Sequence, residues 1–546
     1  MHTTRDPAGQ AFRLEVPERF NYGRDVVDAW ARREPDALAL LAVDPTGETA
    51  TPLSIADVAS GSNRAANAFH GLGLGRGDPV FMMLPRIPAW HLAILGLTKL
   101  GAVPMPGTTL LTPHDIAYRV GRAEALGAIV DADGAAKVEE AAPDLAVKIL
   151  VGDGEAPGPG WRRFDELTAD ASAAPPDVAP TRADDPLLVY FTSGTTGFPK
   201  MVLHTHASYG IGHEITARFW QDLHPGDLHC TLSDTGWAKA AWGTIFGQWR
   251  MGATVFLWDV RGRLDLAQLL RVLGRHHVTT FCAPPTVYRQ LVQLDLAAFP
   301  LPSLRHAVAA GEPLDPETIE RFRAGTGRTI HDGYGQTETV NLVANVPGMH
   351  VRPGSMGKPT PGFDVRIVDD RGEPCAEGEE GNIAVRVAPE RPVGLFREYW
   401  KDPEATAATV VGNWYLTGDL ARADEDGYLW FVGRADDVIT SSAYRIGPFE
   451  VEAALVSHPA VAEAAVVGKP DPTRGEIVKA FVTLAAGVEP SDALAREIQD
   501  HCKRETAPYK YPREIEFVRE LPKTVSGKIR RVELRERERD RASFRP

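Results

Sequence analysis

Hydroxyl side chains, glycines and one lysine are concentrated in the nine-residue segment TSGTTGFPK, which follows the apolar run LLVYF. Gly194 and Gly197 allow backbone N–H groups to turn toward anionic oxygens, and Lys200 supplies positive charge. The segment is not a Walker A loop, because Phe198 and Pro199 separate the second glycine from the lysine. Its composition indicates a polyphosphate-binding loop, while a turn that merely ends a strand explains the local residues equally well. The residues of this predicted loop are Thr192, Ser193, Gly194, Thr195, Thr196, Gly197, Phe198, Pro199 and Lys200.

A second group of candidate residues lies in DGYGQTE, at positions 332–338. The ring of Tyr334 offers a flat face on which a purine can stack, and Glu338 follows a glycine turn with Thr337 beside it. A carboxylate near a hydroxyl-rich phosphate loop is a suitable ligand for Mg²⁺, which prefers oxygen donors. A purely structural turn is the alternative. Another glycine turn, AAGEPL at 309–314, falls at a predicted strand end, which is the ligand-bearing edge of an α/β sheet.

Charged residues nearer the C-terminus complete the set of candidates. Asp419 follows an apolar strand in WYLTGDL, where its carboxylate can accept hydrogen bonds from both hydroxyls of a ribose or can cap a turn. Asp436 follows Arg434 where the chain changes character, so this segment is either a solvated linker or a flexible hinge. Lys528 lies after Gly527 in LPKTVSGKIR. A lysine on such a loop can neutralise charge in a phosphoryl- or acyl-transfer transition state, although the basic residues around it also fit a surface patch.

The composition is that of a globular protein with more than one core. The chain has 546 residues, of which 43% are hydrophobic and 24% charged. Its formal net charge of −14 disfavours nucleic acid and anionic membranes as partners. The four cysteines are widely separated without metal-binding spacing, which fits a reducing compartment. Neither an apolar signal region nor a run long enough to span a membrane is present, so we expect a cytoplasmic protein.

The elements that must position these residues alternate between helix and strand in two stretches. From residue 53 to 130 amphipathic helical segments alternate with apolar runs such as PVFMML and GAIVD. The same alternation resumes at LLVYF and continues to HAVAA at 306–310, after a connection rich in Pro, Ala, Asp and Gly at 153–186. This pattern predicts two doubly wound α/β layers with parallel sheets.

The chain changes character twice more before it ends. From about residue 354, short strands separated by turns such as DDRGEP and EGEEGN predict a small β unit in the form of a distorted barrel. The final hundred or so residues predict a small α+β domain. The predicted fold class is therefore α/β, with a large N-terminal domain at 1–434 that contains both layers and the β unit, a hinge at 435–437, and a small mobile C-terminal domain at 438–546.

Taken in order, seven segments resemble the motifs of the adenylate-forming superfamily, which includes acyl-CoA synthetases, luciferases and peptide-synthetase adenylation domains. The segments are TSGTTGFPK, AAGEP, DGYGQTE, TGD, GRADDVI, YRIGPFEVE and SGKIRR, and the resemblance extends over nearly the whole chain. The strings SDTGW, HPAVAEAAVVGKPDPTRGEIVKAFV and TAPYKYPREIEF are similar to the medium-chain acyl-CoA synthetases, which use fatty acids or benzoate-like acids.

The resemblance implies a reaction in two steps at one site. A carboxylic acid and ATP give an acyl-adenylate and pyrophosphate, and the thiol of CoA then displaces AMP. The implied catalytic residues are Lys528, Glu338 and Thr195, with Thr195 and Glu338 holding Mg²⁺. The implied nucleotide contacts, beyond the loop at 192–200, are Gly311, Glu312, Pro313, Asp332, Gly333, Tyr334, Gly335, Gln336, Thr337, Asp419, Arg434, Arg445 and Lys528.

The same resemblance implies that the small domain rotates about Asp436 between the two steps. The expected CoA path is formed by Ser442, Ala443, Tyr444, Arg474, Lys503, Tyr511, Pro512 and Arg513. The family usually has glycine where this chain has Ala443, and an added methyl group could narrow the path. This departure makes thioester formation less secure than adenylation, so an adenylation enzyme that passes its acyl group to a carrier protein stays open as an alternative.

The acyl group is expected near Trp237, Lys239 and Trp242. Two indole rings on one helix favour a short or medium apolar cavity, although Trp242 fits a plain core position equally well. A non-catalytic nucleotide or acyl-adenylate binding protein is a further alternative, disfavoured because Lys528, Glu338 and Asp419 are all present. The expected partners are a carboxylic acid, ATP and CoA, and the protein is either a monomer or a homo-oligomer.

Overall fold

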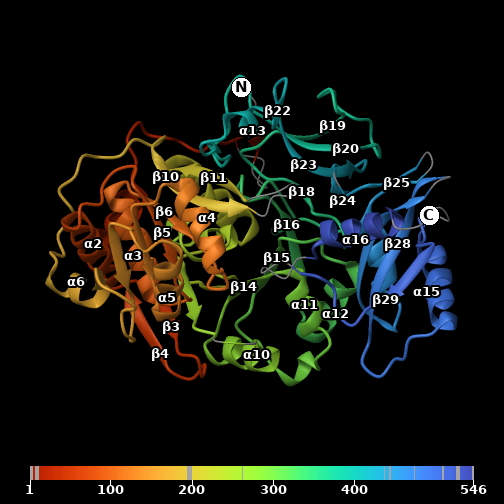
Figure 1. Cartoon of the computed structure of the whole chain (residues 1–546), viewed down its shortest axis with the longest axis horizontal. Helices are drawn as coiled ribbons and strands as arrows, with labels where there is room; N and C mark the ends of the chain where they lie inside the picture. Colours follow the sequence, from red (N-terminus) through yellow and green to blue (C-terminus); the bar gives the residue numbers. More distant parts are fainter. Residues whose placement is uncertain are drawn as a thin grey trace.

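The computed structural model describes residues 4–5, 11–192, 199–260, 262, 264–435, 437–441, 444–471, 474–506, 510–523 and 529–543. Figure 1 shows a large body with two helix-flanked sheets, an antiparallel β unit at one edge of it, and a smaller C-terminal domain at one end of the long axis. The predicted fold class, a large α/β domain followed by a small α+β domain, is confirmed.

The first α/β layer is a five-stranded parallel sheet in the order β6-β5-β7-β8-β9. Every residue of β6, β7 and β8 is buried, which is typical of parallel strands covered on both faces. Helices α2 and α4 begin with capping boxes at Ser54 and Thr112. The elements of this layer are α2 (Ile55–Gly71), β5 (Pro79–Met83), α3 (Pro88–Leu100), β6 (Val103–Pro106), α4 (Pro113–Ala123), β7 (Gly127–Val130), α5 (Ala132–Ala141), β8 (Val147–Leu150), β9 (Trp161–Arg163) and α6 (Phe164–Asp170).

The second layer is a nine-stranded sheet in the order β18-β17-β16-β15-β14-β12-β13-β3-β4. The strands from β3 to β16 in this order run parallel, and antiparallel strands close both edges. Its strands are β3 (Leu38–Val43), β4 (Ala50–Ser54), β12 (Leu228–Thr231), β13 (Thr254–Trp258), β14 (Thr280–Ala283), β15 (His306–Ala310), β16 (Ile330–Tyr334), β17 (Val343–Ala344) and β18 (Lys358–Pro359). The sequence predicted no strand before residue 53, so β3 and β4 are additions that only the long-range pairing of β3 with β13 explains.

Further helices from several parts of the chain pack around the two layers. They are η1 (Tyr22–Asp28), α1 (Ala29–Arg33), η2 (His206–Ile211), α7 (His213–Ile215), η3 (Thr216–Trp220), α8 (Ala238–Thr244), α9 (Phe246–Arg250), α10 (Leu266–Arg275), α11 (Pro285–Leu291), η4 (Leu296–Ala298) and α12 (Pro316–Thr326). No helix in the described part of the chain is long and apolar enough to cross a membrane. A short antiparallel pair, β1 (Thr4–Arg5) with β2 (Ala11–Phe12), precedes them.

The apolar run before the predicted phosphate loop has a different place from the one that the alternation predicted. It forms β10 (Pro186–Thr192), which pairs antiparallel with β11 (Lys200–Thr205), and β11 pairs antiparallel with β21 (Glu398–Tyr399). This three-stranded sheet is separate from the second parallel layer. Because the register places Thr192 opposite Lys200, the two ends of the predicted loop lie side by side.

The small β unit predicted after about residue 354 is an antiparallel sheet of five strands. They are β19 (Val365–Val368), β20 (Glu380–Arg386), β22 (Val410–Val411), β23 (Trp414–Ala423) and β24 (Leu429–Arg434), with α13 (Pro403–Ala407) nearby in sequence. Register shifts in β20 and β23 interrupt the regular pairing, which increases the local twist of the sheet.

The C-terminal domain is a mixed sheet with three helices. Its order is β26-β25-β28-β27, and β29 pairs parallel with β28. Its elements are β25 (Ile439–Ser441), β26 (Tyr444–Ile446), α14 (Pro448–Val456), β27 (Val461–Asp471), β28 (Gly475–Leu484), α15 (Asp492–Glu505), β29 (Glu514–Phe517) and α16 (Arg531–Ser543). The predicted hinge at 435–437 falls where the chain passes from β24 of the β unit to β25 of this domain. The domain boundary itself stays a prediction.

A buried lysine joins the elements that pack beside the first layer. Lys99 on α3 donates hydrogen bonds to Asp28 Oδ1 at 2.7 Å, Asn63 Oδ1 at 2.7 Å and Ser62 Oγ at 2.8 Å. Its side chain has no exposed surface. Burial lowers the pKa of Lys99 to about 8, although Asp28 acts in the opposite direction. The lysine therefore ties η1, α2 and α3 together through one cluster of polar contacts.

Candidate active site

The predicted DGYGQTE segment begins on β16, the last parallel strand of the second layer, and continues beyond its carboxyl end. Two glycines allow aromatic rings to pack directly against this backbone. A Cβ at Gly333 would lie 2.5 Å from the indole of Trp220, and one at Gly335 would lie 2.3 Å from the ring of Trp242. Because these distances are far below van der Waals contact, both positions require glycine for packing, independently of any ligand.

Three side chains converge on Asp419, which lies in the middle of β23. Tyr334 Oη and Gln336 Nε2 both donate hydrogen bonds of 2.6 Å to its Oδ2. Arg434, opposite Asp419 in the β23–β24 register, approaches Oδ1 at 3.9 Å. Burial, followed by the Asp419 carboxylate, raises the pKa of Tyr334 well above its usual range, so the phenol stays protonated as a donor. The sequence predicted Tyr334 as a stacking surface, and the structure adds that its hydroxyl orients a buried carboxylate.

Replacing Asp419 with asparagine is expected to raise the KM for ATP about 10- to 100-fold, because hydrogen bonds to a charged group contribute about 1.5–3 kcal/mol. The kcat for acyl-adenylate formation is expected to change less, since the predicted ribose contact of Asp419 would already form in the ground state. Steady-state pyrophosphate release as a function of ATP concentration measures both. Asp426→Asn, on the turn between the same two strands and 52% exposed, is the matched control. An unchanged KM in Asp419→Asn contradicts a role for this carboxylate in holding the nucleotide.

Glu338 is buried beside this cluster. Tyr399 Oη donates a 2.8 Å hydrogen bond to Glu338 Oε1, and the backbone N–H of Phe396 donates to the Glu338 carbonyl at 2.7 Å. Burial raises the pKa of Glu338, while the Tyr399 hydrogen bond and the charge of Arg434 act in the opposite direction. Among the described residues the carboxyl group thus has few donors to compensate its charge, which is a chemically suitable environment for a hard cation.

Tyr399 also connects Glu338 to the end of the predicted phosphate loop. Lys200 Nζ lies 4.5 Å from the centroid of the Tyr399 ring, whose hydroxyl is bonded to Glu338. The structure therefore brings Lys200 and Glu338 into contact with the same side chain, although 138 positions separate them in the sequence. The sequence did not single out Tyr399. Tyr399 gives no local signal in the sequence, because only the pairing of β11 with β21 brings it to Lys200 and Glu338.

The backbone just before Glu338 is held by two further residues that the sequence did not identify. His204 Nε2 and Tyr209 Oη bond the carbonyl oxygen of Thr337 at 2.7 and 2.8 Å. Burial lowers the pKa of His204 to about 3, so the ring is neutral and its Nε2 carries the proton that faces this carbonyl. The rings of His204 and Tyr209 stack with centroids 3.5 Å apart. Together they fix the turn that carries Glu338.

The predicted phosphate loop lies mainly outside the described residues. Ser193, Gly194, Thr195, Thr196, Gly197 and Phe198 belong to that part, and Thr192, Pro199 and Lys200 are described. The carbonyl oxygen of Pro199 accepts a 3.1 Å hydrogen bond from Tyr118 Oη. The second predicted metal ligand, Thr195, therefore stays a sequence prediction.

The segment Gly311–Pro313 follows β15, at the same edge of the sheet as DGYGQTE. Gly311 has a φ of +106°, which favours glycine. Glu312 is engaged by Arg289 Nη1 at 3.3 Å and by Thr286 Oγ1 at 3.3 Å, and Arg289 Nη2 donates to the Pro313 carbonyl at 2.9 Å. The Glu312 side chain therefore anchors the segment to α11, and the contact of this segment with adenine stays a prediction.

The three predicted acyl-pocket residues lie on or next to α8. Trp237 is the half-buried residue before this helix, and Trp242 is buried against Gly335. Lys239 Nζ donates to the Ala310 carbonyl, so it contacts the end of β15 beside Gly311. The amide N and O atoms of Asn341, which is fully buried near Gly333, have no hydrogen-bond partner in the described part of the chain. Trp242 and Asn341 thus flank the backbone that leads to Glu338.

Part of the predicted CoA path forms a cluster on the C-terminal domain. Lys503 Nζ and the guanidinium of Arg513 lie 4.5 and 5.3 Å from the centroid of the Tyr511 ring. The carbonyl of Pro512 accepts a 3.0 Å hydrogen bond from Gln499. Arg474 lies at the β27–β28 turn, next to Gly475, which pairs with Ser441 of β25. Ser442, Ala443 and the side chains of Tyr444 and Arg445 lie outside the described residues.

Lys528 and the predicted pivot Asp436 also lie outside the described residues, and their flanks are informative. Lys523 and Ile529, which flank the lysine segment, form an antiparallel bridge. The next residue but one, Arg531, begins α16. The pKa of Arg531 is raised. Burial acts to lower it, but the charge and hydrogen bonds of Glu452 outweigh burial, and Asp437 and then Glu312 add smaller contributions. The beginning of α16 is therefore within electrostatic reach of the segment Gly311–Pro313 on the large domain.

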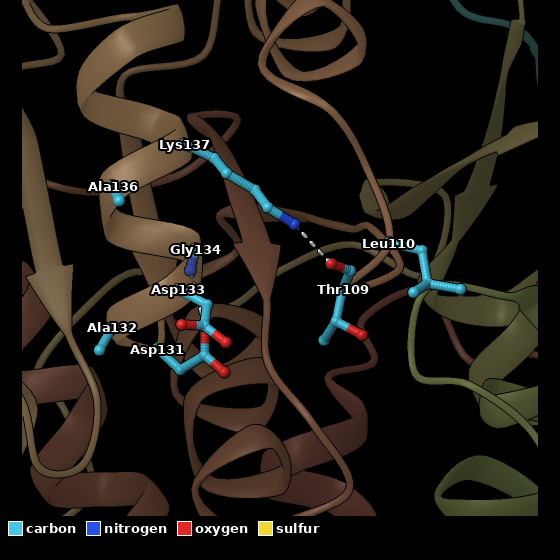
Figure 2. A pocket seen from close by; sticks show the side chains of 8 residues that line it. All are labelled: Thr109, Leu110, Asp131, Ala132, Asp133, Gly134, Ala136 and Lys137. Atoms are coloured by element: carbon cyan, nitrogen blue, oxygen red, sulfur yellow. Dashed lines mark hydrogen bonds between the residues drawn. The ribbon is translucent and has the colours of Figure 1, made fainter. Parts of the chain in front are cut away.

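A separate cavity of about 490 Å³ opens at the carboxyl edge of the first layer, between α5 and the loop after β6. Figure 2 shows Lys137 reaching across it to the Thr109 carbonyl, with Asp131 and Asp133 at the beginning of α5 on one side and Leu110 on the other. The loop that carries Thr109 also contacts the SDTGW string, since Thr108 Oγ1 donates to Asp234 Oδ2 at 3.0 Å. The cavity is thus linked through one loop to Asp234, whose carbonyl accepts a 3.2 Å hydrogen bond from the backbone N–H of Trp237.

Comparison with known proteins agrees with this arrangement. A family described as AMP-binding enzyme matches residues 27–400, and one described as AMP-binding enzyme C-terminal domain matches residues 450–528. The chain is 46% identical over 540 residues to the Homo sapiens protein named acyl-coenzyme A synthetase ACSM3, mitochondrial, with 97% of this chain and 91% of the relative covered. It is 47% identical over 534 residues to the Homo sapiens protein named acyl-coenzyme A synthetase ACSM5, mitochondrial, with 96% and 91% covered.

Solved structures resemble the chain over the same length. The anthranilate CoA ligase AuaEII in complex with anthranoyl-AMP superimposes with a TM-score of 0.88 at 31% identity, covering 97% of this chain and 99% of that one. The benzoate CoA ligase from Burkholderia xenovorans LB400 superimposes with a TM-score of 0.81 at 29% identity, covering 94% of this chain and 100% of that one.

Proposed function

The chain belongs to the AMP-binding enzyme family and joins a carboxylic acid to CoA through an acyl-adenylate, and we propose that its acid is a short- or medium-chain fatty acid or a benzoate-like acid. In the first step a carboxylate oxygen attacks the α-phosphorus of ATP and pyrophosphate leaves. In the second step the thiol of CoA loses its proton, its sulfur attacks the acyl carbonyl, and AMP leaves. The enzyme is thus an acid–thiol ligase of the medium-chain acyl-CoA synthetase type.

The observation that best supports one nucleotide site is the convergence on Asp419. Tyr334 and Gln336 hold this carboxylate, and both Asp419 and Arg434 act electrostatically on Glu338. We assign Asp419 with Arg434 to the ribose, and the backbone of Gly311–Pro313 with the ring of Tyr334 to the adenine. The loop that begins at Thr192 and ends at Lys200 takes the β- and γ-phosphates. Lys528 takes the charge that develops between the substrate carboxylate and the α-phosphate.

Magnesium fits the chemistry of the Glu338 environment. A buried carboxylate whose pKa is raised by desolvation gains a counter-charge from a hard cation, and Thr195 supplies a hydroxyl oxygen of the type that Mg²⁺ accepts. Glu338 and Thr195 would hold the ion, which supplies charge neutralisation on the phosphate oxygens of ATP. Tyr399, His204 and Tyr209 orient Glu338 and its turn for this purpose.

The C-terminal domain contributes the second half of the cycle. Rotation about Asp436 withdraws Lys528 and presents Ser442, Ala443 and Tyr444 to the site. The cations at Arg474, Lys503 and Arg513 then accompany the phosphates of CoA, with Tyr511 and Pro512 between them. The clustering of Lys503 and Arg513 around Tyr511 supports this assignment, since it concentrates positive charge on one face of an acidic protein.

Replacing Ala443 with glycine is expected to raise the rate of thioester formation by up to about tenfold, the lower range of what one methyl group contributes in a fitted pocket, or to leave it unchanged. The rate is measured with synthetic acyl-adenylate and CoA. Acyl-adenylate formation from the same preparation serves as the internal control and should not change. A fall in the CoA step would mean that the methyl group is no obstruction.

The function is tested by an acid panel with CoA present. We expect pyrophosphate release and acyl-CoA formation with at least one of hexanoate, octanoate, 2-methylbutyrate and benzoate. Acyl-adenylate without acyl-CoA favours transfer to a carrier protein instead, and ATP binding without turnover of any acid removes the enzymatic function. A cytoplasmic location and the oligomeric state, monomer or homo-oligomer, stay predictions. Cell fractionation and light scattering test them, and the curated relatives named above are called mitochondrial.

A further inference from the structure

Two arginines on one face of α16 bind carboxylates outside this helix, one on α14 and one in the predicted hinge. Arg531 and Arg535 are four residues apart, so their side chains lie one turn apart on the same face. Arg531 forms a bidentate pair with Glu452 of α14, with Nε–Oε1 at 3.0 Å and Nη2–Oε2 at 2.6 Å. Arg535 Nη1 donates to Asp437 Oδ1. The side chains of Arg535 and Asp437 are only 14% and 11% exposed, so this pair is well shielded from water.

Asp437 occupies a special position, because it directly follows the predicted pivot Asp436. Its backbone N–H donates to the Arg434 carbonyl at 3.0 Å, and the N–H of Val438 donates to the same carbonyl at 3.2 Å. These bonds form a compact turn at the end of β24, which belongs to the large domain. Asp437 is therefore the first described residue beyond the pivot. Any rotation of the backbone at Asp436 reorients Asp437 directly.

Arg535 occupies the complementary position at the other end of the domain. It lies on the helix that begins at Arg531, three residues after Lys528. One residue before it, Leu534 packs in a small core with Leu521 and Phe481, which fixes α16 to the sheet and to the chain that leads into the lysine segment. The Arg535–Asp437 pair thus connects the segment after the pivot directly with the helix that follows Lys528. Arg535 and Asp437 are 98 residues apart in the sequence.

The CoA side of the domain does not depend on this connection. Its described residues lie at the β27–β28 turn, on α15 and in the segment before β29. The strands beside them reach α16 through residues other than Arg535, since Lys479 of β28 pairs with Glu538 at 2.8 Å and Glu516 of β29 pairs with Arg537 and Arg541 at 3.2 and 2.7 Å. A change at Arg535 leaves these ion pairs of α16 with the sheet in place, while it removes the pair that joins α16 to Asp437.

We propose that the Arg535–Asp437 ion pair is a strut that sets the position of Lys528 according to the angle of the hinge, which makes both residues positioning residues for adenylation. This proposal rests on the proposed function, in particular on the use of Lys528 in the first step only. Without the strut, α16 keeps its apolar contacts, but the movement of Lys528 is no longer coupled to the rotation at Asp436. Adenylation is then impaired while the CoA step is spared.

The test compares the two half-reactions in Arg535→Met. We expect single-turnover acyl-adenylate formation to fall about 10- to 100-fold and thioester formation from synthetic acyl-adenylate to stay within about threefold of the wild type. Arg537→Met is the matched control, because Arg537 lies on the same helix, is 48% exposed and pairs with Glu516 at 3.2 Å. Asp437→Asn should reproduce the effect, and the double variant should be no slower than the slower single variant, since both remove the same pair.

Several outcomes overturn the strut. Equal losses in both half-reactions indicate a general structural role, an unchanged adenylation rate shows that the pair is not needed, and additive losses in the double variant show that the two residues act separately. Thermal unfolding of each variant accompanies the kinetics, and if Arg535→Met does not fold, Arg535→Lys, which keeps the charge but loses the fork of donors, replaces it. Wild-type activity with the acid panel is measured first, so failure of the proposed function is recognised before the strut is judged.

Discussion

Replacing Lys528 with alanine is expected to slow acyl-adenylate formation about 100- to 1000-fold, the usual cost of removing one charge-stabilising donor from a transition state. Negative charge builds between the substrate carboxylate and the α-phosphate, and the lysine is the group assigned to neutralise it. Thioester formation from synthetic acyl-adenylate should change far less, because the proposed rotation of the small domain removes the lysine before that step. Rapid-quench measurement of both half-reactions checks this expectation.

The control for Lys528→Ala is a lysine on the same stretch of chain. Lys523→Ala removes a residue that pairs with Glu463 at 2.7 Å and flanks the segment without belonging to it. It should retain adenylation within about threefold of the wild type, as expected for a surface ion pair. Equal losses in both half-reactions of Lys528→Ala would contradict the proposed domain rotation. The electrostatic influence of Glu312 on Arg531 supports a place for Lys528 at the nucleotide site, since the helix after Lys528 begins near the predicted adenine segment.

Replacing Lys99 with methionine is expected to lower the free energy of unfolding of the large domain by about 3–5 kcal/mol, the usual cost of breaking a buried ion pair from one side. The substitution leaves the carboxylate of Asp28 and the amide oxygen of Asn63 buried without the cation that they now bind. Urea unfolding followed by tryptophan fluorescence measures the loss. The effect should appear in the transition in which the large domain unfolds, because Lys99 lies in that domain.

Two companion variants separate the ion pair from packing. Lys99→Met combined with Asp28→Leu should recover much of the loss, since apolar replacement of both partners is often neutral or stabilising. Arg33→Met, which removes an exposed pair with Glu34 at 2.7 Å, should leave the unfolding transition nearly unchanged. If the double variant is no more stable than Lys99→Met, the lysine acts through the hydrogen bonds to Ser62 and Asn63 rather than through the charge of Asp28.

The candidate site was predictable to the extent that its functional residues lie close together in short segments of the sequence. DGYGQTE contains an aromatic ring, a carboxylate and the glycines that two indole rings require, all within seven residues. Asp419 was predicted to follow an apolar strand, but it lies within β23, where it is buried among donors. The alternation of helices and strands predicted the parallel layers, because each helix or strand has its own periodicity.

Strand partners were less predictable. The run LLVYF reads as one more strand of the second layer, and it pairs antiparallel with β11 instead. Residues 38–54 carried no predicted strand, and they extend the second sheet beside β13. Pairing is decided by backbone hydrogen bonds between distant segments, and an apolar run contains no information on which neighbour it will have.

Residue types and their order were sufficient to indicate a large α/β body, a small following domain and the reaction class, since these depend on periodicity and on chemistry held within single loops. Only folding brings Tyr399 to Glu338 across 61 positions and His204 to the Thr337 carbonyl across 133 positions. The same is true of Arg535, which bonds Asp437 across 98 positions. A tyrosine, histidine or arginine has the same local preferences whether it is on the surface or orients a catalytic group. What distinguishes these three is a buried partner, and a buried partner exists only once the distant segments have packed together.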